Sequence, residues 1–262
     1  MLTVQPGDHI GATFLAPAQF ADATVTFAEQ ALAASAQVMV FPGDPYRDRL
    51  DEFRRHLCRR SRTVAAAVAD GRVRLADSRA VQLAPGRFDP DHLHRAYAGA
   101  TRQAVADGFS GLWVSVDMSW AARVDLEALV DFEAGAAGLF TSRELTAICH
   151  YDSRIFSEQQ VAAACQAHPA GLQDRSPLRH RRLHDGRTLS LSGEADLANS
   201  AAFAALAREL RPGDTLDITA MTFLDVRALA TIVRVHTATA GVRIRAGRSQ
   251  SRLLDLIRAG GS

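Results

Sequence analysis

The chain contains no lysine: all 30 basic residues are arginine, set against 29 acidic residues, for a formal net charge of +1. A charge this close to zero creates no long-range field that would attract nucleic acid or an anionic membrane surface. The missing lysine also argues against a Walker-type ATP site, because the P-loop G-x-x-x-x-G-K-[ST] uses its lysine to hold phosphates. The closest match, GDHIGATF from Gly7, has neither the spacing nor the lysine. ATP hydrolysis by this mechanism is therefore not expected.

Cysteine and long apolar runs are also scarce. The three cysteines, Cys58, Cys149 and Cys165, are odd in number and far apart, so neither a disulfide framework nor a Cys-pair zinc site is predicted. The N-terminal residues lack the pattern of a secretory signal, and no apolar stretch has membrane-spanning length. With 47% hydrophobic and 23% charged residues, the composition is typical of a globular protein of one or two domains. We expect a cytoplasmic protein.

Short apolar runs alternate with amphipathic segments up to residue 168. A parallel sheet covered by helices on both faces is predicted, because its strands are continuously apolar rather than alternating. Asp89, with Pro90 after it, and Ser157 are the predicted N-caps of two helices. The predicted strands are 9–15, 37–44, 72–77, 111–120 and 144–152, and the predicted helices are 17–35, about 46–71, 88–108, 124–140 and 157–168.

A polar, arginine-rich segment without periodicity follows, AGLQDRSPLRHRRLHDGR from Ala170. We interpret it as a solvated linker. A nucleic-acid patch is the alternative, but no aromatic residues are interleaved to stack on bases. His180 and His184 have the i, i+4 spacing of a metal pair, yet no rigid helix is expected to hold them.

The C-terminal part has the order βαβαβα. Its predicted strands are 188–193, 214–225 (a strand running into a loop) and 242–247, and its helices are 194–211, 226–241 and 249–261.

This C-terminal part resembles the STAS domain of bacterial anti-sigma-factor antagonists. The resemblance rests on LSLSGEADLANSAAFAALA, LDITAMTFLDVRALATIV and VRIRAGRSQSRLLDLIRAGG, in that order. It implies binding to an anti-sigma factor or related regulatory protein. In the family, a serine just after a conserved Asp is phosphorylated and breaks the complex.

Here the Asp-Ser-Ser-Gly pattern of the family reads Asp225-Val226-Arg227-Ala228, so both serines are missing. Regulation by phosphorylation at this loop is not expected. Asp225 is the predicted N-cap of the following helix, and Arg227 should point outwards towards a partner. Asp225, Val226 and Arg227 are the predicted partner-binding residues. The helical spacing also predicts a core face of Val226, Leu229, Ala230 and Val233.

Residues 7–169 resemble the MEDS sensory domain of DcmR-type regulators. The matching blocks are GDHI, GRFDPDHL, DGFSGLWVSVDMSWA and ICHYDSRIFS. The resemblance implies a scaffold of RecA/KaiC-like ancestry that binds a small, apolar, hydrocarbon-related ligand.

Ligands of open parallel sheets bind outside the carboxyl ends of the strands, where aromatic, sulfur and polar side chains converge in this sequence. Each of these residues also has an ordinary structural role open to it in the core or in a turn, and His9 stands at the start of its strand. The candidate ligand-binding residues are His9, Phe14, Asp117, Trp120, Cys149, Tyr151 and Asp152.

The sequence thus predicts a RecA/KaiC-like parallel-sheet sensory domain over 1–172, a basic linker over 173–187 and a small α/β STAS-like domain over 178–262. We expect a non-enzymatic regulator without catalytic residues or a metal, whose ligand or cofactor the sequence does not identify. The alternative is a dimerisation or scaffold protein with a degenerate STAS domain. An enzyme using Cys149, His150 and Asp152 is the least favoured interpretation, since no G-x-S-x-G nucleophile motif occurs.

Overall fold

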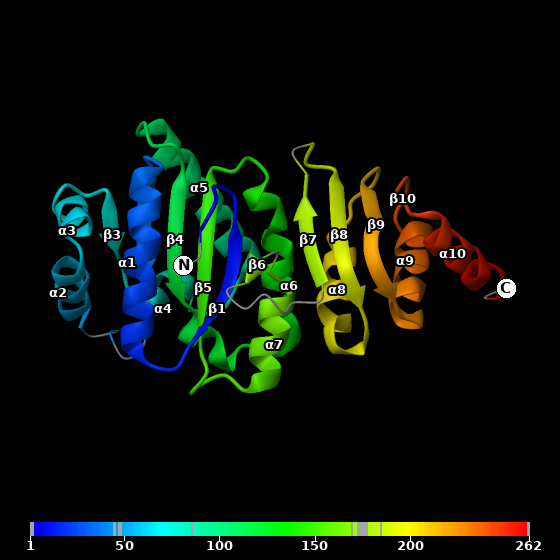
Figure 1. The fold of residues 1–262 in the computed structure, drawn as a ribbon, viewed down its shortest axis with the longest axis horizontal. Coiled ribbons are helices and arrows are strands. Elements are labelled where there is room, and N and C mark those ends of the chain that lie inside the picture. The colour runs from blue at the N-terminus through cyan, green and yellow to red at the C-terminus, as the bar shows by residue number, and fades with distance from the viewer. Residues whose placement is uncertain are drawn as a thin grey trace. The chain divides into compact units, whose positions relative to one another are not determined.

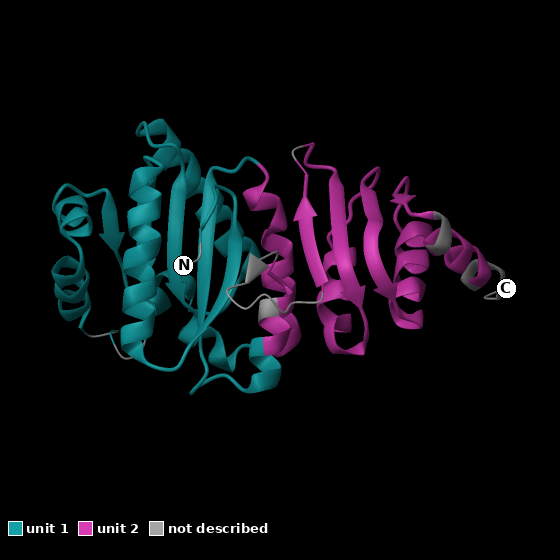
Figure 2. Cartoon of the chain, in the orientation of Figure 1, with its two compact units in different colours: residues 1–124, 142–161 teal, residues 125–141, 162–262 magenta. Residues whose placement is uncertain are grey.

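The computed structural model describes residues 3–43, 46, 49–84, 86–168, 170–171, 178–183 and 185–260. The chain divides into two compact units (Figure 2). Unit 1 comprises residues 1–124 and 142–161, and unit 2 comprises residues 125–141 and 162–262. Among the described residues, none of the helices combines the length and apolar character needed to cross a membrane.

Unit 1 is built on a sheet of five parallel strands in the order β3-β2-β4-β5-β1 (Figure 1). The predicted parallel sheet is confirmed, with each strand paired in parallel to its neighbours. Every residue of β4 and β5 is buried, which explains their unbroken apolar sequence. The strands are β1 (His9–Phe14), β2 (Gln37–Phe41), β3 (Val73–Leu75), β4 (Leu112–Asp117) and β5 (Leu145–Asp152).

Helices join these strands, and several begin where the sequence places a cap. Asp89 accepts a hydrogen bond from the His92 amide at 2.9 Å, as predicted. Ser157 Oγ accepts from the Gln160 amide at 3.3 Å, and Gln160 Oε1 accepts from the Ser157 amide at 2.9 Å, which is a reciprocal capping box. The helical elements are α1 (Pro17–Ala33), α2 (Leu50–Arg60), α3 (Arg62–Ala69), α4 (Ser78–Gln82), α5 (Pro90–Ala106), the 3₁₀ segment η1 (Met118–Arg123) and α7 (Glu158–Gln166), whose C-terminal part belongs to unit 2.

The single helix predicted over about 46–71 is wrong. The structure has α2 and α3 instead, separated by Ser61, whose backbone is extended at φ −146° and ψ 123°. Ser61 Oγ accepts a hydrogen bond from the Val64 amide and donates one to Glu29 Oε1 at 2.6 Å. A serine that caps a new helix start competes with continuation of the old helix, and periodicity alone does not reveal this.

Unit 2 contains a four-stranded sheet in the order β10-β9-β8-β7. Strands β8, β9 and β10 are parallel, and β7 runs antiparallel to β8. The predicted βαβαβα order from residue 188 is confirmed. The elements of the unit are β6 (Ala170–Gly171), β7 (Leu178–Arg182), β8 (Thr188–Ala195), β9 (Thr215–Leu224), β10 (Arg243–Arg245), α6 (Leu126–Gly135), η2 (Ala136–Phe140), η3 (Leu197–Asn199), α8 (Ser200–Arg208), α9 (Val226–Ala238) and α10 (Arg248–Gly260).

Part of the arginine-rich segment is ordered. The interpretation as solvated linker is wrong for Leu178 to Arg182, which form β7 with Leu178 and His180 buried. Alternate side chains of a strand point to opposite faces, so two apolar-side positions suffice to anchor a strand that is otherwise arginine. Residues 172–177 and His184 lie outside the described residues.

Helix α6 belongs to unit 2 although it precedes β5 in the chain (Figure 2). Its Val130 and Ala134 join the apolar core formed with α8 and the β7–β10 sheet. At the surface, Asp131 forms an ion pair with Arg208 of α8. The boundary predicted from the sequence places this helix in the first domain.

Candidate functional site

The connections of the unit 1 sheet create two crevices at its carboxyl edge. From β2 the chain continues outwards to β3, whereas from β4 it continues in the opposite direction to β5. After β1, α1 packs on one face, where the Phe20 ring lies 4.9 Å from the His150 ring. After β5, Phe156 packs on Tyr151, on the other face, at 5.2 Å. Neighbouring strands whose connections diverge are where open α/β sheets bind ligands.

Asp117 occupies the crevice between β2 and β4. Its Oδ1 accepts hydrogen bonds from the Ser119 amide at 2.8 Å and the Ser119 hydroxyl at 2.5 Å, and Gly43 contributes a backbone hydrogen bond. A Cβ atom on Gly43 would lie 2.8 Å from the Asp117 carboxyl carbon, so only glycine fits. Burial raises the pKa of Asp117 to about 6, and the Asp152 carboxylate adds to the rise, against the hydrogen bonds from Ser119 and Gly43.

Asp152 and Arg154 lie at the crevice between β1 and β5. The Arg154 Nε is 2.9 Å from Oδ1 of Asp152, and its Nη2 is 2.5 Å from Oδ2. The Asp152 side chain is fully buried, whereas the Arg154 side chain is 47% exposed. Burial alone would raise the pKa of Asp152, but the hydrogen bonds and charge of Arg154 hold it below its ordinary value. This carboxylate is therefore ionised and paired.

The seven predicted ligand-binding residues are all buried, and the structure divides those on strands between two faces of the sheet. Because alternate residues point to opposite faces and Phe14 pairs with Asp152, one face carries Phe14, Asp117 and Asp152. The other carries His9, Cys149 and Tyr151. Trp120 lies in η1, with its ring 5.5 Å from that of Phe88. A ligand-binding role for these residues stays a prediction.

An aromatic cluster surrounds the carboxyl end of β1. The ring of Phe14 lies 5.7 Å from that of Phe20, which stacks on Phe53 at 5.4 Å. Tyr46 lies 4.8 Å from Phe53 and is partly exposed. The surroundings on this face are thus apolar and rigid, which suits recognition of a hydrocarbon group.

A buried polar chain runs beneath this cluster. Thr24 and Ser115 hydroxyls are 3.0 Å apart, and Ser115 Oγ is 3.2 Å from His150 Nε2. Burial lowers the pKa of His150 to about 3, so the imidazole is neutral. Since all three side chains are almost fully buried, the chain orders the core rather than offering a nucleophile to substrate.

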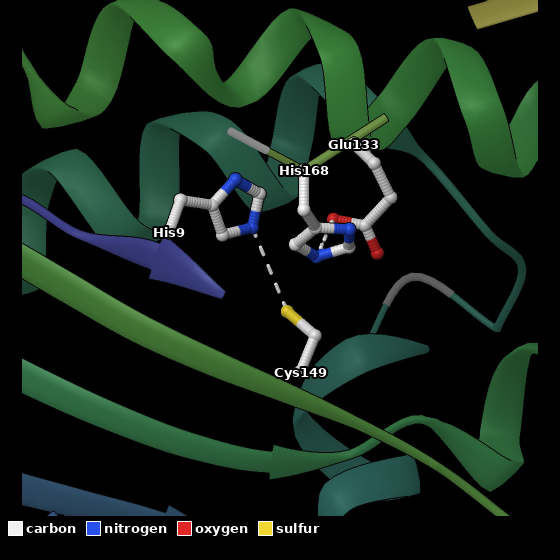
Figure 3. Close-up of side chains that lie close together, drawn as sticks. All are labelled: His9, Glu133, Cys149 and His168. Carbon is white, nitrogen blue, oxygen red and sulfur yellow. Dashed lines mark hydrogen bonds and ion pairs between the residues drawn. The ribbon is translucent and has the colours of Figure 1, made fainter. Parts of the chain in front are cut away.

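Figure 3 draws two further buried pairs, one in each unit. In unit 1, the Cys149 thiol lies 3.6 Å from His9 Nε2, so the start of β1 and the middle of β5 are linked by a soft hydrogen bond. In unit 2, Glu133 of α6 lies 3.3 Å from His168 Nε2, with both side chains buried. His168 Nδ1 lies 2.8 Å from the Ala164 carbonyl and must donate to it. The second pair therefore favours a proton shared between Nε2 and the carboxylate.

In unit 2, the predicted cap of α9 is confirmed and its predicted core face is partly wrong. Asp225 Oδ1 accepts a hydrogen bond from the Ala228 amide at 2.7 Å. Val226, expected in the core, is 74% exposed, whereas Ala228, Leu229 and Ile232 are buried. The capped first turn aims Val226 into solvent because the buried stripe of the helix starts at Ala228. Arg227 is exposed, as predicted.

Two residues that the sequence did not single out extend this exposed surface. Phe223 is 51% exposed and pairs with Glu194, and Leu197 is 66% exposed just beyond the end of β8. The Asp225 amide donates to the Ala195 carbonyl at 2.9 Å, which holds the two segments side by side. Leu197, Phe223, Val226 and Arg227 together are termed the switch-loop surface below. A phenylalanine at the end of an apolar strand resembles core, so only the structure reveals its exposure.

Comparison with known proteins identifies the N-terminal region. The family model for the methanogen/methylotroph DcmR sensory domain, MEDS, matches residues 8–169. This span includes unit 1 strands and the α6 and α7 segments of unit 2. None of the curated proteins compared with the chain matches it.

Among solved structures, two of the DUF1998 helicase MrfA were found, one bound to DNA and one bound to DNA and AMPPNP. Their TM-scores are 0.35 and 0.33, their identities 10% and 12%, and each match covers 90% of this chain. The chain spans about a third of the helicase, at 33% and 35%. Likenesses this weak carry no argument about fold or function. The family match covers more than half of the 262 residues, and the chain belongs to the MEDS sensory-domain family.

Proposed function

We propose that the protein is a non-enzymatic signalling regulator in which a small ligand bound by unit 1 controls the binding of a regulatory protein by unit 2. The observation that carries the proposal is the match of residues 8–169 to a sensory domain. A sensing role follows from that membership, and its chemical details are argued from the site.

The ligand site proposed is the carboxyl edge of the unit 1 sheet. Its apolar wall is the aromatic cluster around Phe14, and its polar groups are Asp117 and the Asp152–Arg154 pair. A RecA/KaiC-like ancestry would explain a sheet-edge site without a P-loop, as expected of a nucleotide-binding scaffold reused for another ligand.

The output proposed is STAS-like binding of an anti-sigma factor or related regulatory protein through the switch-loop surface. Large apolar side chains exposed to the extent of Phe223 and Val226 at adjacent positions are typical of an interaction site. Asp225 caps α9 without a neighbouring serine, so the proposed interaction is not controlled by a phosphate at this loop.

Substitution of Val226 by glutamate tests the output. A charge placed at the centre of a protein interface should weaken binding to a purified anti-sigma factor of the same organism by about 30-fold or more. The matched control is Leu256→Glu, which changes a residue of α10 that is also well exposed, at 69%. Affinity is measured by biolayer interferometry.

A loss confined to Val226→Glu supports the proposal. If no anti-sigma factor or related regulator binds, and sedimentation instead shows a dimer that Val226→Glu dissociates, the protein is a scaffold and the proposed output is wrong. Equal effects of the two substitutions would also contradict it.

A further inference from the structure

We propose that the crevice between the carboxyl ends of β1 and β5 binds a short-chain aliphatic carboxylate, held by Arg154 and covered by Leu15 and Ile155. The inference rests on the proposed ligand-sensing function and narrows it to one chemical class. It adds an anionic head group to a ligand otherwise expected to be purely apolar.

Arg154 is oriented by the protein but not used up by it. Asp152 takes the Nε and Nη2 edge of the guanidinium, which fixes the plane of the group. Within the described part of the chain, Nη1 of Arg154 makes no hydrogen bond, and the side chain is 47% exposed. The outer edge, formed by Nη1 and the second hydrogen of Nη2, matches a carboxylate bidentately.

Two exposed apolar side chains flank that edge. Leu15, directly after β1, is 64% exposed, and Ile155, directly after Arg154, is 45% exposed. The Ser153 amide donates to the Phe14 carbonyl at 2.9 Å, so the segments that carry the two residues lie side by side. Their exposed surface is small, which suits an alkyl chain of a few carbons rather than a second protein.

The local charge selects a monoanion over a phosphate. Arg154 and Asp152 nearly cancel, and the Asp117 carboxyl is close enough to act on Arg154 electrostatically. A dianion would meet this negative charge with only one guanidinium to offset it. A carboxylate needs two parallel hydrogen bonds and adds one charge, which the outer edge of Arg154 satisfies.

The test is an NMR titration of the full chain with pentanoate and with pentanamide, which has the same shape without the charge. We expect pentanoate to bind with a Kd of roughly 1 mM, with shifts around residues 15 and 155, and pentanamide to bind about 10-fold more weakly or worse. Arg154→Gln should weaken pentanoate binding about 10- to 100-fold.

The control for that variant is Arg72→Gln. Arg72 forms a similar pair with Asp70 two residues earlier, with Nε to Oδ2 at 2.9 Å and 42% exposure, but it precedes β3 at the opposite edge of the sheet. It should leave pentanoate affinity unchanged.

Because Arg154→Gln leaves the buried Asp152 unpaired and may therefore not fold, a second variant keeps the test decisive. Leu15→Ser with Ile155→Ser changes only exposed side chains and should weaken pentanoate by about threefold to tenfold while leaving acetate affinity nearly unchanged. Val105→Ser, at a 37% exposed residue of α5, is its control.

The proposal is overturned if pentanamide binds as tightly as pentanoate, if the shifts map elsewhere, or if the Leu15/Ile155 variant behaves like its control. Binding of a neutral apolar ligand in place of pentanoate would reject the carboxylate while leaving ligand sensing intact. The partner measurement with Val226→Glu is independent of both results.

Discussion

Substitution of Asp117 by asparagine should increase the stability of unit 1 at neutral and alkaline pH. Asp117 is buried between β2 and β4, and its pKa is raised from 3.8 to about 6, chiefly by burial. Asparagine has the same shape, and its carbonyl oxygen can still accept the hydrogen bonds from Ser119. The substitution therefore removes the cost of burying a charge and keeps most of the contacts.

The size of the effect follows from the difference in pKa between the folded and unfolded states. Because the folded chain holds the Asp117 proton more tightly, the stabilisation is complete below pH 3.8 and is lost as the pH rises through about 6. At about 1.36 kcal/mol for each pH unit, the loss amounts to about 3 kcal/mol by pH 8. The free energy of unfolding of Asp117→Asn, minus that of the wild type, should rise by up to this amount between pH 4 and pH 8.

Urea unfolding followed by tryptophan fluorescence measures this quantity in the right unit. Both tryptophans of the chain, Trp113 and Trp120, lie in unit 1. The difference between variant and wild type cancels the titration of other groups, including His150, whose pKa is lowered to about 3. The reasoning is refuted if the difference does not change between pH 4 and pH 8, or if it falls as the pH rises.

Three further substitutions probe the fold around the sites. His180→Gln should reduce the acid sensitivity of unit 2, because burial lowers the pKa of His180 to about 4 and its stabilisation is lost as the pH falls from 6.5 through that value; circular dichroism at pH 4 to 7 checks this, and an unchanged acid transition would contradict it. Asp225→Ala should cost about 1 kcal/mol of unfolding free energy by loss of the α9 cap, whereas Asp225→Ser should largely preserve it, as urea titration can show. Gly43→Ala should destabilise unit 1 by about 1–3 kcal/mol, because its Cβ would meet the Asp117 carboxyl; Gly99→Ala, in α5 with no side-chain or backbone atom closer than 4.0 Å to the added Cβ, is the control and should be neutral or stabilising.

The strands and caps were predictable because their signals are local. Continuous apolar runs identified β4 and β5, and the Asp89 and Ser157 caps follow from one side chain and the amide three residues on. The break at Ser61 and the strand β7 were missed for the opposite reason. Both depend on tertiary partners, Glu29 for Ser61 and β8 for β7, which periodicity does not contain.

The candidate site was predictable in place but not in composition. The rule for parallel sheets points to the carboxyl edge, and Asp117 and Asp152 are there. Arg154 was overlooked because an arginine in a turn after a strand is ordinary in a chain with 30 of them. Its pairing with Asp152, and the exposure of Leu15 and Val226, depend on side-chain directions that appear only in three dimensions.

The central claim is that ligand binding by unit 1 controls partner binding by unit 2. The most direct measurement is the Kd of the full chain for its anti-sigma or related regulatory partner, determined without ligand and with pentanoate at saturation. The account predicts a change of about fivefold or more, abolished by Leu15→Ser with Ile155→Ser. The same Kd in both conditions, with ligand binding independently verified, would contradict it.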